Sequence, residues 1–291
     1  MNIQWYPGHM TKTRRQIEAD LGQVDMVAEI IDARIPVSSR NPDIDALVGT
    51  KPRLVVLNRA DQADRVGNET WTKYFRAKGL AVLETDAKTG KGVQAFASAA
   101  RELLKDLIER KREKGQVGRP VRAMIVGVPN VGKSTFINQV ARRKSAKAGD
   151  RPGVTRGKQW VTVDAGLLLL DTPGILWPKF EDERVGLHLA YTGAVKDDVM
   201  DVETLACRLM DDLAQRYPGA LAQRYGLEAL PRQEDQDPVA YGYELLELAA
   251  QRRGFRISGG ELDTERMAHI LLDEFRGGKL GHFTLEWPTE A

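Results

Sequence analysis

One segment of this chain has the residue types and spacing of a phosphate-binding loop. The pattern G-x-x-x-x-G-K-S spans Gly127–Ser134, and in such loops consecutive backbone amides cradle a phosphate chain. The lysine, here Lys133, reaches the β- and γ-phosphates, and the serine holds Mg²⁺. The apolar run Val121–Val126 predicts the strand that feeds the loop, and Thr135–Val140 predicts a helix whose positive end strengthens phosphate binding. The segment therefore predicts nucleotide chemistry.

A second segment predicts the Mg²⁺ side of the same site. The apolar run Leu167–Leu170 predicts a buried strand, and Asp171-Thr-Pro-Gly174 follows it. In P-loop enzymes an Asp at such a strand end holds the Mg²⁺ shell, and the glycine amide senses the γ-phosphate. We interpret Arg151-Pro-Gly-Val-Thr155 as a switch in which Thr155 binds Mg²⁺ when a γ-phosphate is present, although a simple turn is the more common meaning of Pro-Gly.

A third segment predicts that the base is guanine. The apolar strand Leu54–Leu57 ends in Asn58-Arg-Ala-Asp61, whose carboxylate can accept two hydrogen bonds from the guanine ring N–H and amine. Adenine lacks this donor pair and would leave the carboxylate unpaired, which is how hydrogen-bonded sites reject analogues. We expect Asn58 to brace the loop. After the next strand, the Ala87 amide is expected to reach the guanine oxygen while the stem of Lys88 packs on the base.

The order of these motifs predicts a circularly permuted α/β domain with a mostly parallel sheet, because the base loop precedes the phosphate loop. An open α/β sheet binds ligand beyond the carboxyl ends of its strands, so the site depends on which loops meet there. A helical apolar stripe from Val93 to about Arg112 and the linker Glu113–Pro120 are expected to join the original termini. The predicted strands are Met26–Ile31, Leu54–Leu57, Leu80–Glu84, Val121–Val126 and Leu167–Leu170.

Beyond Lys179 the apolar spacing becomes helical, which predicts a second domain. We expect the permuted nucleotide domain over 1–178 and a smaller all-helical domain over 179–291, with Trp177–Phe180 as the hinge or as simple aromatic packing at the boundary. The predicted helices are Val185–Val195, Val202–Tyr217, Pro238–Arg253 and Thr264–Phe275.

Together these motifs resemble the circularly permuted GTPases, and among them the ribosome biogenesis GTPase A family. The resemblance implies GTP or GDP as ligand and a GTPase that promotes a late step of large (50S) subunit assembly and leaves upon hydrolysis. Its implied partners are the pre-50S particle, 23S rRNA and ribosomal proteins, and its C-terminal domain would bind RNA. Besides the loops above, the resemblance is carried by Trp5-Tyr-Pro-Gly-His-Met10, Asp32-Ala-Arg-Ile-Pro36, Ser39-Arg-Asn-Pro42 and Gly174-Ile-Leu-Trp-Pro-Lys-Phe-Glu-Asp182.

The resemblance also implies the hydrolytic groups. Many GTPases place a Gln after D-x-x-G to orient water, but this chain has Ile175, which cannot hydrogen-bond water. The resemblance singles out His9 instead, since an imidazole can orient or deprotonate water; the alternative is a structural histidine. Related GTPases with an asparagine at the place of Asn130 hold K⁺ where an arginine finger would act, and the alternative for Asn130 is a turn cap.

Two departures from the family pattern lie in the base loops, with Arg59 in place of the usual Lys and Asp86 in place of a common Ser. Neither removes the atoms that would recognise guanine. The expected catalytic residues are His9, Asn130 and Lys133. The expected metal ligands are Ser134, Thr155 and Asp171 for Mg²⁺ and Asn130 for K⁺. The expected nucleotide-binding residues are Asn58, Arg59, Asp61, Asp86, Ala87, Lys88, Asn130, Val131, Gly132, Lys133, Ser134, Thr135 and Gly174.

Composition favours a cytoplasmic protein without a membrane partner. The 291 residues suffice for two domains, and the single Cys207 excludes an internal disulfide and suits a reducing cytosol. No apolar run is long enough to span a bilayer. We expect a monomer off the ribosome. The net charge is only +2, but a basic cluster surrounds the predicted switch at Arg142, Arg143, Lys144, Lys147, Arg151, Arg156 and Lys158, and it suits RNA phosphates or is simply solvated.

Two alternatives stay open. One is an RNA-binding assembly factor that is gated by nucleotide and hydrolyses it only incidentally. The other is an assembly GTPase for the small subunit, as other permuted GTPases are. The segments Pro7–Met10 and Trp177–Phe180 favour the large subunit by resemblance alone.

Overall fold

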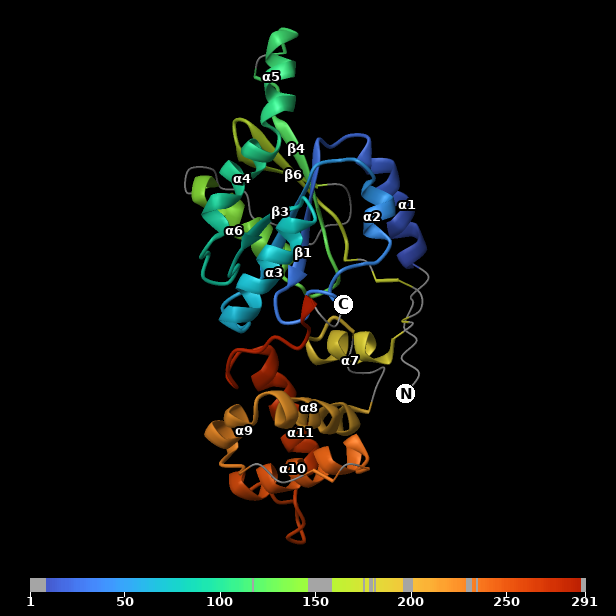
Figure 1. Ribbon diagram of the computed structural model, residues 1–291, viewed down its shortest axis with the longest axis vertical. Helices are drawn as coiled ribbons and strands as arrows, with labels where there is room; N and C mark the ends of the chain where they lie inside the picture. Colours follow the sequence, from blue (N-terminus) through green and yellow to red (C-terminus); the bar gives the residue numbers. More distant parts are fainter. Residues whose placement is uncertain are drawn as a thin grey trace. The chain divides into compact units, whose positions relative to one another are not determined.

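The computed structural model describes residues 9–116, 118–145, 159–174, 176–177, 180, 182–195, 201–228, 232–233 and 235–288, without the side chains of 9–13, 142–145 and 159. The chain forms two compact units, which are described separately (Figure 1). The sheet unit comprises the described residues of 6–179 and 284–291, and the helical unit those of 180–283.

The sheet unit is built on strands in the order β3-β2-β1-β4-β6-β5, six within the described residues. The strands are β1 Met26–Asp32, β2 Arg53–Asn58, β3 Ala81–Glu84, β4 Val121–Val126, β5 Gln159–Asp164 and β6 Leu167–Asp171. Neighbours pair in parallel except β5 with β6. Every residue of β1 is buried, as expected for a central strand of a sheet covered on both faces. The predicted mostly parallel α/β sheet is confirmed.

Helices cover both faces of this sheet. In Figure 1, α1 (His9–Leu21) and α2 (Ile44–Val48) lie on one side, and α4 (Phe96–Leu103) and α6 (Lys133–Ser145) lie on the other. The Phe96 and Phe136 rings meet edge to face with centroids 5.2 Å apart, which fixes α4 against the helix after the phosphate loop. The remaining helix on the sheet, α3 (Arg65–Ala77), packs on β3.

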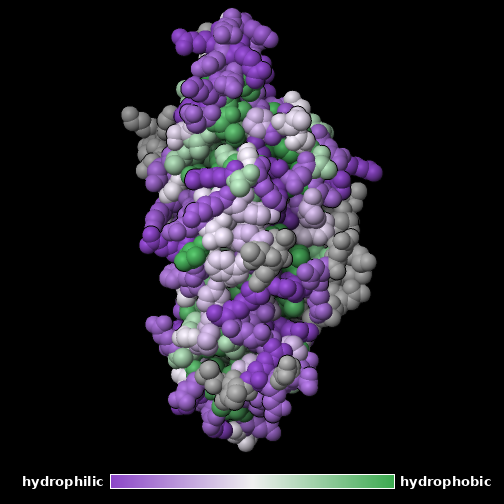
Figure 2. Space-filling model, in the orientation of Figure 1, coloured by the Kyte–Doolittle hydropathy of each residue, from purple (hydrophilic) through white to green (hydrophobic). Residues whose placement is uncertain are grey.

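The sheet unit differs from the expectation in two places. The single helix expected from Val93 to Arg112 is a 3₁₀ turn (Val93–Ala95) followed by α4 and then α5 (Lys105–Glu113), whose surface is hydrophilic (Figure 2). The helix breaks at Leu104, whose backbone leaves helical geometry while its side chain stays buried. The antiparallel edge strand β5 was not predicted, because polar residues flank and interrupt Trp160, Val161 and Val163, so it lacks a four-residue apolar run like Leu54–Leu57.

The helical unit is organised around α8 (Val202–Arg216), which packs against α10 (Pro238–Arg253) and α11 (Thr264–Arg276). An aspartate precedes each of these helices and accepts hydrogen bonds from its first free amides. The helix α7 (Glu183–Tyr191) begins in the same way after Asp182. The helix α9 (Pro218–Tyr225) was not predicted; it begins with Pro218-Gly219, and proline suits the first helical position.

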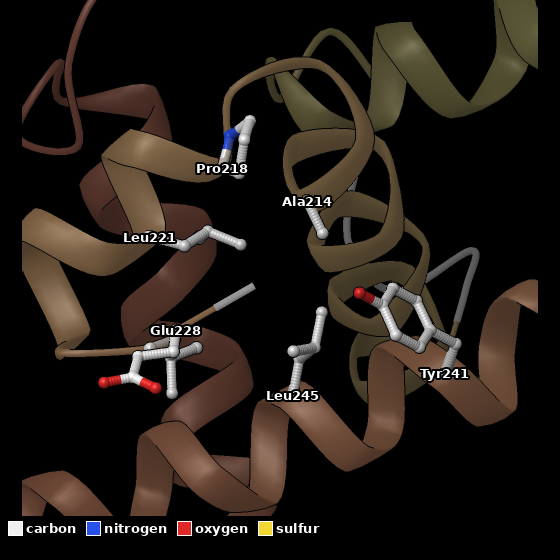
Figure 3. A pocket seen from close by; sticks show the side chains of 7 residues that line it. Ala214, Pro218, Leu221, Glu228, Tyr241 and Leu245 are labelled. Atoms are coloured by element: carbon white, nitrogen blue, oxygen red, sulfur yellow. The ribbon is translucent and has the colours of Figure 1, made fainter. Parts of the chain in front are cut away.

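A small hollow, partly open to solvent, lies among α8, α9 and α10 of the helical unit (Figure 3). The side chains of Leu221 from α9 and Leu245 from α10 point into it. The full lining is Ala214, Pro218, Leu221, Leu227, Glu228, Tyr241 and Leu245. Most of these side chains are apolar, and no set of polar groups converges on the hollow, so it is a packing defect between helices rather than a reaction site.

The domain boundary differs from the predicted one at the C-terminus. We expected the helical domain over 179–291, whereas the described residues from 284 onward group with the sheet unit; the predicted boundary between 178 and 179 stays a prediction. The reason is that Thr284, Leu285 and Glu286 are buried among residues of the sheet unit and hydrogen-bond to them.

The α8–α10 contact generates a stability prediction. An added Cβ at Gly242 would lie 1.9 Å from the carbonyl oxygen of Cys207, so Gly242→Ala forces the two helices apart. We expect a loss of about 2 kcal/mol in the free energy of unfolding, measured by urea denaturation. The matched control is Gly219→Ala, since no atom lies within 4 Å of the added methyl group there. Equal unfolding midpoints for the two variants would contradict this close helix contact.

Candidate active site

The phosphate loop lies between β4 and α6, the strand–loop–helix context that the motif requires. Its second glycine is constrained by a neighbouring loop. Gly132 has φ 101°, and an added Cβ would lie 2.4 Å from Nδ2 of Asn58. A side chain here would therefore strain the backbone and push away the base loop. Ser134 and Thr135 are exposed on the first turn of α6, where backbone amides and the helix dipole favour an anion.

The ammonium of Lys133 is held at the centre of this loop. Nζ donates to the carbonyl oxygens of Gly127 at 3.0 Å and Val128 at 2.9 Å, and the side chain is buried. Burial lowers the pKa of Lys133 to about 8, although the charge of Asp171 acts in the opposite direction. Burial likewise raises the pKa of Asp171, with Lys133 partly offsetting it. Lys133 and Asp171 thus attract each other electrostatically beside the phosphate loop.

The D-T-P-G segment is fixed against the phosphate loop. Asp171 ends β6 opposite Ile125 of β4, and the hydroxyl of Thr172 donates to the Ile125 carbonyl oxygen at 2.6 Å. A Cβ added at Gly174 would lie 2.8 Å from the Cα and N of Pro129. The glycine predicted to sense a γ-phosphate therefore touches the backbone of the loop predicted to bind it.

Asn58 joins three loops of the site. Its Nδ2 donates to the carbonyl oxygen of Val131 at 2.9 Å, and its Oδ1 accepts from the Ala87 amide at 3.0 Å and from the Thr85 hydroxyl at 3.2 Å. The side chain is only 2% exposed, so none of these bonds competes with solvent. Asn58 therefore braces the base loop, the phosphate loop and the loop after β3 together.

The loop after β3 is shaped by Asp86. Its Oδ1 accepts from the amides of Lys88 at 2.8 Å and Thr89 at 3.2 Å, and its Oδ2 accepts from the Thr89 hydroxyl. The aspartate thus builds the turn that presents Ala87, which accounts for its presence where the family often has Ser. Because the Ala87 amide already donates to Asn58, its expected bond to the guanine oxygen stays a prediction. Lys88 is exposed beside this turn.

The carboxylate of Asp61 lies at the open edge of the base loop. Partial loss of hydration and the nearby charge of Asp86 raise the pKa of Asp61. Paired N–H donors would relieve this unfavourable environment of the anion, and a guanine edge supplies them. The arrangement fits the predicted role of Asp61 in base recognition, which stays a prediction.

Two residues of the site hold backbone conformations that side chains disfavour. Within the described part of the chain, Arg59 (φ 58°) and Asn130 (φ 56°) are the non-glycine residues with positive φ. They also contact each other, since Nη2 of Arg59 donates to the Asn130 carbonyl oxygen at 3.3 Å. Outliers of this kind persist where the surroundings enforce them and gather at functional sites.

A buried ion pair beside the base loop was missed by the sequence analysis. The Arg34 guanidinium, fully buried, binds Asp32 at the end of β1 through bonds of 3.0 Å and 2.8 Å. Burial raises the pKa of Asp32, but the charge of Arg34, its hydrogen bonds and the charge of Arg59 together outweigh burial and hold the pKa below its usual range. Asp32 also lies 3.6 Å from Nε of Arg59. The available signal was a pair of opposite charges, Asp32 and Arg34, two positions apart at the end of a buried strand.

Several predicted residues lie outside the description. Thr155 and Ile175 are not among the described residues, and His9 is described only as the first residue of α1, without its side chain. The same holds for the side chains of the basic cluster around the predicted switch. Their roles stay predictions.

The basic residues of the helical unit divide into structural and exposed ones. Arg276 donates to the carbonyl oxygens of Ala190 and Tyr191, and Arg253 lies over the ring of Tyr225, 3.6 Å from a Glu274 oxygen. Arg252, Arg256 and Lys279 are exposed. Within the described ranges no group of three or more His, Cys, Asp or Glu could hold a metal ion, and no helix is both long and apolar enough to cross a membrane.

The fold and these loops define a P-loop GTPase, and comparison with known proteins identifies the branch. A family model described as a 50S ribosome-binding GTPase matches residues 122–218. Ribosome biogenesis GTPase A of Priestia megaterium is 48% identical over 100% of this chain and 99% of its own length. Mitochondrial ribosome-associated GTPase 1 of Mus musculus is 34% identical over 97% of this chain and 90% of its own.

A solved structure agrees with these relatives. GNP-bound YlqF from T. maritima superposes with a TM-score of 0.64 at 28% identity, covering 96% of this chain and 100% of that one. The chain belongs to the ribosome biogenesis GTPase A family. The family resemblance inferred from the sequence is thereby confirmed, as is the GTP-hydrolysing class.

The buried Lys133 predicts a pH dependence of nucleotide binding. Its pKa of about 8 means that near pH 8 much of the lysine is neutral, whereas an anionic phosphate chain favours the ammonium. Binding of GDP should therefore take up roughly half a proton at pH 8, and affinity should fall as pH rises above this value, by at most about tenfold per pH unit.

Calorimetry in buffers of different ionisation enthalpy measures this uptake. Lys133→Met is the matched control, because loss of the guanine ring proton at high pH affects both proteins equally. Equal proton uptake by wild type and Lys133→Met would show that Lys133 stays charged throughout.

Proposed function

We propose that this GTPase binds the maturing large (50S) ribosomal subunit, promotes a late assembly step and leaves upon hydrolysis. The observation that carries the proposal is the match of residues 122–218, from the phosphate-loop strand into the helical unit, to a model described as 50S ribosome-binding. Full-length relatives named for ribosome biogenesis support it. The expected partners are the pre-50S particle with its 23S rRNA and ribosomal proteins, and we expect a cytoplasmic monomer off the ribosome.

The geometry supports specific roles for the described residues. Asp61 would pair with guanine, Asn58 and Arg59 would hold the base loop in place, and Lys133 would leave its loop carbonyls to bind phosphate oxygens. Ser134 on the first turn of α6 and Asp171 at the end of β6 offer the hydroxyl and carboxylate oxygens that Mg²⁺ prefers. Together with Thr155 they would hold the ion, which supplies charge neutralisation between the phosphates when bound.

Hydrolysis needs an oriented water and a positive charge near the phosphates. We propose His9 for the first, since Ile175 cannot hydrogen-bond water. For the second we propose K⁺ bound by the exposed amide of Asn130, because an amide oxygen is a suitable alkali-metal ligand and the residue lies in the phosphate loop. Exposed basic side chains such as Arg252, Arg256 and Lys279 would contact RNA phosphates.

The alternative is a nucleotide-gated RNA-binding factor, acting on the small subunit or with incidental hydrolysis. The two proposed functions differ in which ribosomal particle stimulates GTP hydrolysis. We expect immature large subunits to accelerate GTP hydrolysis many-fold and small subunits to have little effect, as measured by phosphate release. Depletion of the protein should leave a stalled large-subunit precursor in sucrose gradients. A stalled small-subunit precursor would overturn the large-subunit assignment.

His9→Ala provides the control that separates catalysis from binding. If hydrolysis is the purpose of the site, this variant should bind GTP and large subunits as wild type does but lose the stimulated turnover. Wild-type turnover by His9→Ala on the particle would leave His9 with a structural role.

Asn130 predicts a cation preference. Turnover by the wild-type protein should be several-fold faster in KCl than in NaCl at equal ionic strength, because the bound cation offsets charge that develops between the phosphates. Asn130→Gly should abolish the preference, since glycine keeps the left-handed backbone while removing the amide oxygen. Asn138→Ala, in the body of α6, is the control. Equal rates in both salts would restrict Asn130 to shaping the turn.

A further inference from the structure

The last described segment of the chain is built into the sheet unit. Thr284 and Leu285 are at most 1% exposed and Glu286 is 7% exposed, although the segment directly follows Phe283 of the helical unit. Two of these three consecutive buried residues, Thr284 and Glu286, have polar side chains. Burial of this kind requires partners for the polar atoms, and the sheet unit supplies them.

One set of partners lies on α3, the helix after the base loop. The Thr284 hydroxyl accepts a hydrogen bond at 3.2 Å from the amide of Asp64, the residue that caps α3. The indole Nε1 of Trp71 donates to the Glu286 carbonyl oxygen at 2.8 Å, and Trp71 is itself buried. The segment therefore holds the first turns of α3, which begins at Arg65, four residues after Asp61 of the base loop.

The other partners lie on the loop after β1. The Leu285 amide donates to the Arg34 carbonyl oxygen at 2.8 Å. The Glu286 carboxylate accepts from the amides of Val37 at 2.6 Å and Ser38 at 3.0 Å, and from the Ser38 hydroxyl. Charge-assisted bonds in a buried setting are stronger than neutral ones, so this carboxylate fixes the conformation of the loop.

That loop leads to the nucleotide site through a chain of charged contacts. The guanidinium of Arg34 binds the Asp32 carboxylate, which lies 3.6 Å from Nε of Arg59. Arg59 in turn donates to the carbonyl oxygen of Asn130 in the phosphate loop. Both end residues of this last contact have the left-handed backbone that needs external support.

We propose that Thr284–Glu286 is a positioning element of the guanine site, and that it controls how tightly GDP is held. The segment fixes the Arg34 loop and the start of α3. Asp32 then holds the Arg59 guanidinium, which keeps the base loop and the phosphate loop in register. The inference rests on the proposed roles of Arg59 and Asn130 in nucleotide binding.

The test is the dissociation rate of fluorescent GDP from Glu286→Gln. The neutral amide leaves the buried donors of Val37 and Ser38 without a full anionic partner, so we expect release about threefold to tenfold faster. Glu102→Gln, at an exposed position of α4, is the matched control and should release GDP at the wild-type rate. Thr284→Val keeps the side-chain volume, loses the hydrogen bond from the Asp64 amide, and should change release in the same direction by a smaller factor.

A double-mutant cycle tests whether the segment Thr284–Glu286 affects GDP release through Arg59. Arg59→Lys keeps the positive charge but cannot span Asp32 and Asn130 as the guanidinium does. If the segment acts through Arg59, Glu286→Gln should accelerate release by less than about twofold in the Arg59→Lys background. Hydrogen exchange should also rise at residues 59–61 and 130–132, sites that a purely local role would leave unchanged.

Two results would overturn the proposal. One is wild-type GDP release by both folded variants, Glu286→Gln and Thr284→Val, with folding verified by circular dichroism. The other is an undiminished effect of Glu286→Gln in the Arg59→Lys background. Neither result bears on the subunit assignment, which is tested separately by stimulated turnover of the wild-type protein.

Discussion

The site depends on one buried amide side chain. Asn58 uses its donor on the phosphate loop and its acceptor on the loop after β3, and it belongs to the base loop itself. Only a side chain with a donor and an acceptor at one end can make both bonds, so neither an aspartate nor a leucine of the same size would serve. Its bond to Val131 joins positions 73 residues apart in the chain. Two loops that we propose to recognise opposite ends of a nucleotide are therefore held together by one side chain.

The circular permutation is tolerated because the hydrogen bonds of Asn58 depend on which loops meet at the site and not on the order of these loops along the chain. The strand β1 pairs in parallel with β2, which carries the base loop, and with β4, which feeds the phosphate loop. The carboxyl ends of all three strands therefore meet at one edge of the sheet, where α/β proteins bind ligands. Cutting and rejoining the chain elsewhere changes which loop is made first but leaves the set of loops at that edge intact.

The parts of the fold that were predictable are those with a local signal. The strands β2 and β6 contain the continuous apolar runs Leu54–Leu57 and Leu167–Leu170, and the motifs at their ends mark the site. The strand β5 has no such run, α9 starts with Pro-Gly, and the helix break at Leu104 has no sequence mark, so each was missed. The segment Thr284–Glu286 has no pattern at all, because its partners lie more than 200 residues earlier in the chain and its burial is set only by the folded tertiary structure.

The same contacts account for the arginine at position 59. A lysine ammonium is a single point of charge on a flexible stem, whereas a guanidinium presents donors in several directions from one plane. Arg59 uses this shape, with Nε toward Asp32 and Nη2 on the Asn130 carbonyl oxygen. The Asp32 carboxylate is available because Arg34 keeps it ionised in a buried position. The departure from the family's usual lysine is thus part of a connected arrangement in which the strained backbones at Arg59 and Asn130 support each other.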